Sequence, residues 1–308
     1  MFGQNFVRIK SKYSIELIKT DIKLSEYKIN KFRSTLLQNT ISARESEKSN
    51  NAYFLEVPKS LFYKSILSEF EQYYVRSLLQ LSDFTNMETN INDSWKYTTY
   101  YYSFFFSNVA LQRYLQKGYF YLDTGDAKNL SSILSAIMPF SVSIGSGNWH
   151  FKKTGESLSN VEIEITKVGG NVHQLVWQDL KSTLKLFEQQ SARANNTVEN
   201  TILTNLYRTI KSNQNFSPSE VRNYLNYVSE ISIEELNNKI RCPQIKEADF
   251  IKNLSAFNYN NSYESKIKFS ILLGQYLNSF NRAIIEDIEL KNSTSFKLKK
   301  KYKRKSIS

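Results

Sequence analysis

Apolar residues recur at helical spacing along most of this chain. After Pro58 they fall every three or four positions on one face, at Leu61, Phe62, Ile66, Phe70, Tyr74, Leu78 and Leu79. This pattern predicts an amphipathic helix that begins near Pro58 and continues to about Leu81. Similar patterns predict further helices over 15–37, 126–138, 172–186, 195–211 and 266–290, with a short one from Ser232. Another helix, which carries Val221–Val228, is predicted to start at Ser217-Pro-Ser-Glu, with Ser217 as its N-cap and Pro218 at the first helical position.

The most aromatic segment is Trp95–Lys117. Its apolar residues surround the whole circumference of a helix: Trp95, Tyr97, Tyr100, Tyr101, Tyr102, Phe104, Phe105, Phe106, Val109, Leu111, Tyr114 and Leu115. A helix that is apolar on every side is normally surrounded by other elements. We therefore expect this segment to be the central helix. Gly118 is expected to end it, because glycine readily adopts the left-handed conformation found at helix C-termini.

A different pattern fills residues 139–170. Ser141–Trp149 and Val161–Thr166 alternate polar and apolar residues, with Gly and Asn between them, and this predicts a small β-hairpin. The charged, Ser/Asn-rich residues 42–51 predict a loop. The expected fold class is mainly α, a helical bundle with a small inserted β-hairpin. Short β-like runs also occur at Phe6–Ile9 and Ala52–Val57.

Composition agrees with a helical, cytoplasmic protein. The 308 residues include only 9 Gly and 4 Pro, and sparse turn residues favour long helices. The single cysteine, Cys242, excludes an intrachain disulfide and fits a reducing compartment. The first residues lack the apolar core of a secretory signal. The longest apolar stretch, Tyr97–Phe106, is too short to span a bilayer about 30 Å thick, so no membrane contact is expected.

Most of the net charge lies at the C-terminus. The net charge is +12, and residues 291–308 hold eight basic residues and no acidic one, which leaves +4 for the rest (12 − 8 = 4). Such a block can neutralise phosphates and bind nucleic acid. The favoured interpretation is a solvated tail that only improves solubility. The candidate nucleic-acid-binding residues are Lys297, Lys299, Lys300, Lys301, Lys303, Arg304 and Lys305.

The sequence carries no motif for a metal or a cofactor. Two histidines and one cysteine occur, without Cys-x-x-Cys or His-Glu-x-x-His spacing, so no metal site is expected. A phosphate-binding glycine loop and a Gly-x-Ser-x-Gly turn are also missing, and no cofactor is expected.

His173 and Trp177 form a possible accessory site, because residues four apart share a helix face. One interpretation is a catalytic or RNA-contacting imidazole beside a stacking indole. The other is a capping or core histidine packed under a tryptophan. The second is favoured, because the sequence shows no partner for proton transfer.

Two segments resemble the helices of HEPN domains. Residues 94–115 read Ser-Trp-Lys-Tyr-Thr-Thr-Tyr-Tyr-Tyr-Ser-Phe-Phe-Phe-Ser-Asn-Val-Ala-Leu-Gln-Arg-Tyr-Leu. This is similar to a HEPN helix in which Tyr-Tyr-x-x-Phe-Phe precedes small residues and leucines. Val221–Tyr227 resembles the signature helix, in which Arg and a polar residue are followed after three positions by His. Arg222 and Asn223 match that signature, whereas Tyr227 occupies the histidine position.

The resemblance implies a helical bundle that dimerises with its signature helices facing across the interface. Active members are metal-independent RNases of toxin–antitoxin, CRISPR-associated and antiphage systems, whose Arg and His act on the phosphate and the 2′-hydroxyl. By this resemblance the candidate catalytic residues are Arg222, Asn223 and Tyr227. Arginine offers a permanently charged planar fork to phosphate. Tyrosine, with an ordinary pKa of about 10, is a poor general base at neutral pH.

Three functions stay open on the sequence alone. The first is a HEPN-like component of a prokaryotic antiphage or toxin–antitoxin system that binds RNA. Whether it also cleaves RNA stays open, because Tyr227 occupies the position of the signature histidine. The second is a catalytically inactive structural or adaptor subunit of a defence complex, which binds a partner protein and uses its tail for nucleic acid. The third is a regulatory or antitoxin-like subunit that does not contact nucleic acid. The expected partners are RNA or another nucleic acid, and a second copy of the chain or the product of a neighbouring gene.

The expected organisation has four parts. They are an N-terminal segment at 1–57, a HEPN-like bundle at 58–240 with its β insertion at about 139–170, a helical part at 241–290 and a disordered basic tail at 291–308.

Overall fold

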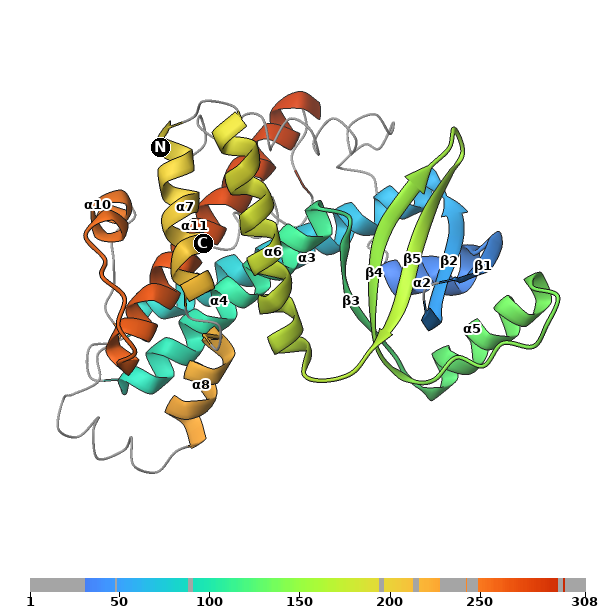
Figure 1. Ribbon diagram of the computed structural model, residues 1–308, viewed down its shortest axis with the longest axis horizontal. Helices are drawn as coiled ribbons and strands as arrows, with labels where there is room; N and C mark the ends of the chain where they lie inside the picture. The colour runs from blue at the N-terminus through green and yellow to red at the C-terminus, as the bar shows by residue number, and fades with distance from the viewer. Residues whose placement is uncertain are drawn as a thin grey trace. The chain divides into compact units, whose positions relative to one another are not determined.

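The computed structural model describes residues 31–47, 49–87, 91–193, 197–212, 216–227, 242, 249–292 and 296. The predicted strand at Phe6–Ile9, the helix from Ser232 and the candidate residues of the basic tail lie outside this part of the chain. The elements, in chain order (Figure 1), are α2 (Phe32–Asn39), β1 (Ser42–Ser46), β2 (Ser49–Pro58), α3 (Lys59–Asn86), α4 (Asp93–Tyr114), β3 (Lys117–Leu122), α5 (Thr124–Ile137), β4 (Gly147–Glu156), β5 (Asn160–Val168), α6 (Val172–Arg193), α7 (Thr197–Ser212), α8 (Pro218–Tyr227), α10 (Phe250–Ser255) and α11 (Tyr263–Asn292).

The predicted fold class is wrong, because the strands form a full sheet rather than one hairpin. The predicted hairpin is present as β4 and β5, with Phe151 opposite Ile165. β5 also pairs with β2, with Leu55 opposite Ile163, and the antiparallel sheet has the order β1-β2-β5-β4-β3. Residues 42–51, expected to be a loop, contain β1 and the start of β2. The protein therefore combines its helices with a five-stranded antiparallel sheet.

The described chain forms two compact units. Unit 1 contains Tyr73–Asn108 and His173–Ile288. Unit 2 contains the described residues before Tyr73, the segment Val109–Val172 and the described residues after Ile288. Helices α3 and α4 each contribute one part to each unit, so both units are assembled from segments that are far apart in the sequence.

Unit 2 is built on one buried face of the sheet. Along β2 and β5 every second side chain is buried, including Leu55 and Ile163 at 0% exposure. This follows from the two-residue period of a strand. Helices α2 and α5 pack against the strands, and the ring of Phe32 stacks on Phe151 with 3.8 Å between centroids. The opposite face of the sheet carries polar pairs such as Lys152 with Glu164.

A buried ion pair connects three elements of unit 2. Arg113, near the end of α4, pairs with Glu69 of α3 and donates a hydrogen bond of 2.6 Å to a backbone carbonyl of β3. The guanidinium occupies the space that a Cβ at position 118 would need, and Gly118 has a φ of +143°, so only glycine fits there. The prediction that Gly118 ends the helix is wrong. α4 ends at Tyr114, and Gln116 adopts the left-handed conformation with a φ of 58°.

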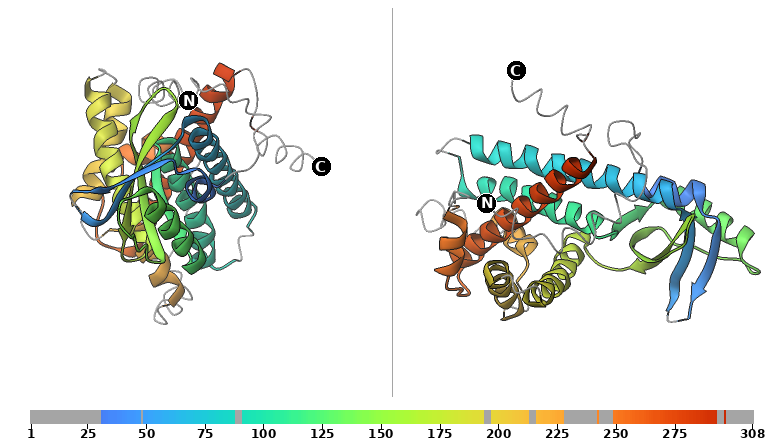
Figure 2. Two further views of the ribbon diagram at one scale, coloured as in Figure 1. Left: turned by 90° about the vertical axis from the view of Figure 1, so that its right-hand side faces the viewer. Right: turned by 90° about the horizontal axis from the view of Figure 1, so that it is seen from above.

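The aromatic helix α4 lies among several helices of unit 1. It runs antiparallel to α3 (Figure 2), with Phe84 against Tyr100 at 4.6 Å between ring centroids. Asn281 of α11 donates hydrogen bonds to the carbonyl and the hydroxyl of Ser107 at 2.6 and 2.7 Å. The predicted central position of this segment is therefore confirmed, although Trp95 in its first turn is 63% exposed.

Over the part of the chain that the structure describes, no helix has both the length and the apolar character needed to cross a membrane.

Candidate nucleic-acid interface

Helix α8 begins where the sequence predicts it to begin and carries Arg222 into unit 1. Ser217 precedes Pro218 at the first helical position, and its carbonyl accepts a hydrogen bond of 3.0 Å from the backbone N–H of Glu220. Val221 and Leu225 are buried on the inner face of the helix. This short amphipathic element holds Arg222 at the boundary between the core and the surface.

The guanidinium of Arg222 lies against two aromatic side chains of α4. Its carbon is 5.4 Å from the ring centroid of Tyr101 and 5.9 Å from that of Tyr102. Its Nη1 donates a hydrogen bond of 3.2 Å to the hydroxyl of Tyr102. Among the described residues, its buried Nε has no hydrogen-bond acceptor. A guanidinium has five N–H donors, and the described hydrogen bond to Tyr102 uses one of them.

His173 joins the same cluster from the start of α6. Its Nδ1 lies 2.7 Å from the hydroxyl of Tyr101, and its ring stacks on Phe105 with 4.2 Å between centroids. The indole N–H of Trp177 also donates to the Tyr101 hydroxyl, at 3.4 Å. The Tyr101 hydroxyl therefore accepts a hydrogen bond from the indole, while the direction of its bond with His173 Nδ1 depends on the imidazole tautomer.

The electrostatic setting of His173 favours a neutral imidazole. Burial, and to a lesser degree the positive charge of Arg222, lower the pKa of His173 below its ordinary value of 6.5. Burial also raises the pKa of the Tyr101 hydroxyl. At neutral pH the cluster therefore contains one permanent cation, Arg222, beside uncharged hydrogen-bonding groups.

The residues that the HEPN resemblance groups together differ in their burial and contacts. Arg222, His173 and Trp177 all contact Tyr101. Asn223 is exposed, and Tyr227 is 76% exposed near the end of α8. Arg222 is thus half-buried, whereas Asn223 and Tyr227 are exposed. Their assignment as a catalytic set stays a prediction.

Next to the cluster, an open pocket of about 480 Å³ lies between α6, α7 and α8. Trp177 belongs both to the cluster and to the wall of this pocket. Four of the wall residues come from α6: Gln174, Trp177, Gln178 and Lys181. Their spacing of i, i+3, i+4 and i+7 is that of one helix face, so the sequence contains a signal for this surface that motif searching does not detect.

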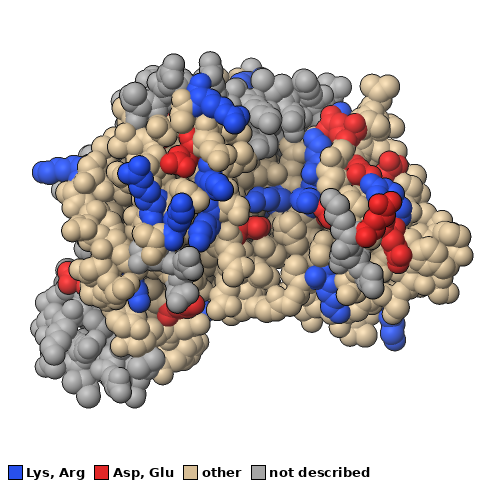
Figure 3. Space-filling model, viewed as in Figure 1, with Lys and Arg blue, Asp and Glu red and all other residues tan. Residues whose placement is uncertain are grey.

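Basic side chains gather on α6 and α7 of unit 1 (Figure 3). Lys185, Arg193, Arg208 and Lys211 are exposed, and Lys181 is half-buried in the pocket wall. The acidic residues of these helices are less accessible, because Asp179 and Glu188 are half-buried and Glu199 is 4% exposed. The accessible charge of this face is therefore mainly positive.

Metal chemistry finds no support in the described residues. They contain no group of three or more His, Cys, Asp or Glu side chains that is arranged to hold a metal ion. Cys242 is buried, and burial raises its pKa to about 12, which disfavours the thiolate that binds metals.

Comparisons of this chain with family models, with curated proteins and with solved structures found no match. The resemblance to HEPN domains thus stays a prediction that rests on the residues quoted above.

Proposed function

We propose that the protein binds single-stranded RNA through unit 1, with Arg222 as the anchoring contact to a phosphate. The carrying observation is the guanidinium, which is held against the rings of Tyr101 and Tyr102 and donates from Nη1 to the Tyr102 hydroxyl. An arginine supported in this way presents a planar fork with little loss of side-chain entropy. A guanidinium can donate two parallel hydrogen bonds to the oxygens of one phosphate.

The charge distribution supports the same proposal. The exposed cations of α6 and α7 lie on helices that form the pocket next to Arg222's cluster. A positive surface attracts the phosphate backbone, and aromatic side chains then hold unstacked bases of a single strand. The choice of RNA rather than DNA comes from the resemblance to HEPN domains.

The geometry supports binding better than cleavage. His173 is the titrating group of the cluster, and its Nδ1 is engaged by Tyr101. Tyr227, which would have to replace the signature histidine, lies exposed and has the chemistry of a weak base. We therefore propose the non-catalytic function, in which the protein holds RNA without cutting it.

The test is the affinity of the full-length protein for a fluorescent single-stranded RNA, measured by anisotropy in EDTA at fixed salt. Arg222→Met should weaken binding about tenfold to a hundredfold, because a charge-assisted hydrogen bond to phosphate is lost. The RNA affinity of Arg222→Lys should fall between those of the wild type and Arg222→Met, because lysine keeps the positive charge but lacks the planar guanidinium. Circular dichroism should show that both variants are folded.

Arg44→Met is the matched control. Arg44 lies 3.8 Å above the ring of Phe54 and pairs with Glu162, but it belongs to the sheet of unit 2. Replacing Arg44 changes the net charge by the same amount and should leave RNA affinity within about twofold, as expected for a surface charge outside the proposed site. Equal effects of the two substitutions would contradict the proposal. RNA fragments that appear in EDTA and disappear in a His173→Ala variant would show a nuclease instead.

A further inference from the structure

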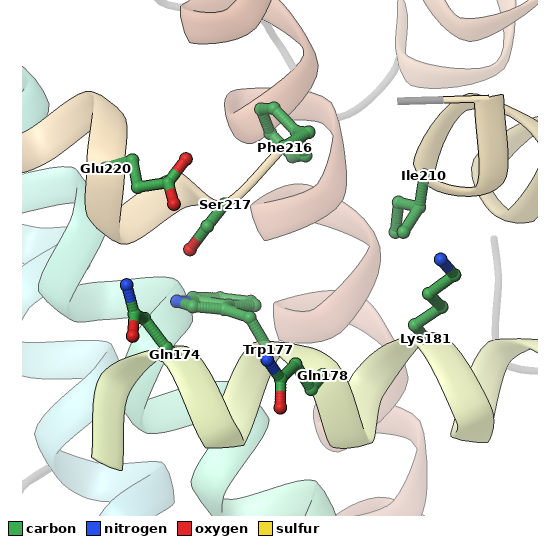
Figure 4. A pocket seen from close by; sticks show the side chains of 8 residues that line it. All are labelled: Gln174, Trp177, Gln178, Lys181, Ile210, Phe216, Ser217 and Glu220. Carbon is green, nitrogen blue, oxygen red and sulfur yellow. The ribbon is translucent and has the colours of Figure 1, made fainter. Parts of the chain in front are cut away.

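The pocket of unit 1 places chemically different groups on its opposite sides. Figure 4 shows the indole of Trp177 along α6, with Phe216 facing it from the residues just before α8. The carboxylate of Glu220 lies on one side and the amine of Lys181 on the other. The volume of about 480 Å³ falls in the range of about 300–1,000 Å³ that is usual for small-molecule sites.

Both aromatic walls are held in place from behind. The indole N–H of Trp177 donates to the Tyr101 hydroxyl, which fixes the orientation of the ring. Phe216 contacts Phe269 and Tyr259 edge to face, with centroid distances of 5.2 and 6.1 Å. Rigid apolar walls that face each other favour a flat ligand ring, because little side-chain freedom is lost when it enters.

The carboxylate of Glu220 determines which ring fits. Among the described residues, no side chain donates a hydrogen bond to it or forms an ion pair with it, although it faces the pocket. A carboxylate accepts two parallel hydrogen bonds from adjacent N–H groups. Guanine presents such a pair on its Watson–Crick edge, at N1 and at the 2-amino group. Adenine and cytosine present an acceptor beside their amino group, and uracil places carbonyls on both sides of its N–H.

The other polar groups of the pocket suit the rest of a guanine nucleotide. The amides of Gln174 and Gln178 can donate to the 6-oxo group or to N7 of a guanine. Lys181 does not pair with Glu220 and leaves its positive charge for an anion. Lys185 follows one helical turn later and is exposed. A phosphate attached to the bound base would therefore meet positive charge along α6.

We propose that this pocket binds a guanine base carrying a phosphate, with Glu220 as the residue that selects guanine. The inference deepens the proposed function and rests on it for the source of the base, which would be an unstacked guanosine of the bound RNA. A free guanine nucleotide has the same chemistry, and the experiment separates the two sources.

The first measurement is isothermal titration of the full-length protein with GMP, AMP and guanosine. GMP should bind at least about tenfold more tightly than AMP, because adenine leaves the Glu220 carboxylate opposite an acceptor. Guanosine should bind about threefold to fivefold more weakly than GMP, as expected for the loss of one ion pair near the surface.

Two variants test the roles of the charged residues. Glu220→Gln should bring the GMP-to-AMP affinity ratio to within about threefold, since an amide offers one donor in place of an acceptor. Lys181→Met should weaken GMP and leave guanosine unchanged. Glu264→Gln is the matched control, because Glu264 is exposed and lies in the first turn of α11, as Glu220 does in α8. Glu264→Gln should change neither the GMP-to-AMP affinity ratio nor the GMP-to-guanosine affinity ratio.

Single-stranded RNA with and without guanine completes the experiment. A preference for guanine-containing RNA that Glu220→Gln removes would support the pocket and an RNA source. GMP binding with these variant effects, but without RNA binding, would support a free-nucleotide site and overturn the proposed function. RNA binding that depends on Arg222, without selectivity for GMP over AMP, would overturn the pocket proposal and leave the proposed function intact.

Discussion

At the scale of single residues, burial decides how charged groups behave in this protein. Arg222 is half-buried, and its guanidinium, a permanently charged group, rests against aromatic faces. Glu199, in the first turn of α7, is 4% exposed. Burial raises its pKa from 4.5 to about 7, since the low-dielectric interior disfavours the charged carboxylate. These two residues lead to opposite expectations when they are replaced.

Glu199→Gln should stabilise the protein above neutral pH. The folded-state pKa of Glu199 lies above the unfolded value, so its favourable contribution is complete below pH 4.5 and is lost as the pH rises through 7. At about 1.4 kcal/mol per pKa unit, the shift of about 2.5 units (7 − 4.5) corresponds to a loss of about 3–4 kcal/mol at pH 8. Denaturant unfolding should therefore give similar stability for both proteins at pH 5 and a more stable variant at pH 8.

Glu286→Gln serves as the control for this substitution, since Glu286 is exposed on α11. It should change the free energy of unfolding by less than about 0.5 kcal/mol at either pH. The assigned pKa would be contradicted if the difference in the free energy of unfolding between the wild type and Glu199→Gln were the same at pH 5 and pH 8.

At the scale of elements, the contact between α4 and α11 depends on small and polar residues. Asn278 donates to the hydroxyl of Ser103 at 3.1 Å, and Asn281 donates to Ser107. Gly274 faces Phe104, where a Cβ would lie 2.9 Å from the Cβ of that phenylalanine. The close approach of the two helices at this point therefore depends on the missing side chain.

Gly274→Ala should destabilise unit 1 despite the better helix propensity of alanine. The gain of about 1 kcal/mol from propensity is outweighed by overpacking of about 1–3 kcal/mol, because the Cβ of Phe104 cannot move without its backbone. The melting temperature should fall by several degrees, as measured by calorimetry. Gly169→Ala is the comparison, since an added methyl there meets nothing within 4 Å. A stabilised Gly274→Ala variant would mean that the helices can separate without cost.

At the scale of the whole molecule, positive charge is supplied in two places. The face of α6 and α7 carries exposed cations, and the C-terminal residues 291–308 contribute eight of the 41 basic residues. A structured face can select a ligand, whereas a block of charge acts through counterion release with little selectivity. The two should therefore contribute differently to RNA binding.

Deletion of residues 297–308 removes seven basic residues and should weaken RNA binding equally for all sequences. If all seven neutralise phosphates, the slope of log K against log salt should decrease by about 5, from about 0.7 per phosphate on a single strand. Anisotropy titrations at about 50 to 200 mM salt measure this slope. An unchanged slope would show that the tail only adds solubility.

The local patterns of the sequence determined most of the helices. Hydrogen bonds of an α-helix join residues four apart, so the periodicity after Pro58 and the Ser217–Pro218 start are sufficient to predict α3 and α8. The aromatic circumference of α4 likewise predicted its central position. The pairing of β2 with β5 could not be predicted in this way, because it joins residues on either side of α3 and α4.

The candidate site depends still more on the tertiary structure. The sequence singles out Arg222, His173 and Trp177, but only the packing of α4, α6 and α8 brings all three to Tyr101 and leaves Tyr227 exposed. The residue types determine the chemistry that each side chain can perform, since charge, planarity and donor number are properties of the amino acid. Which of these groups act together is decided by contacts between distant helices, and no local pattern encodes those contacts.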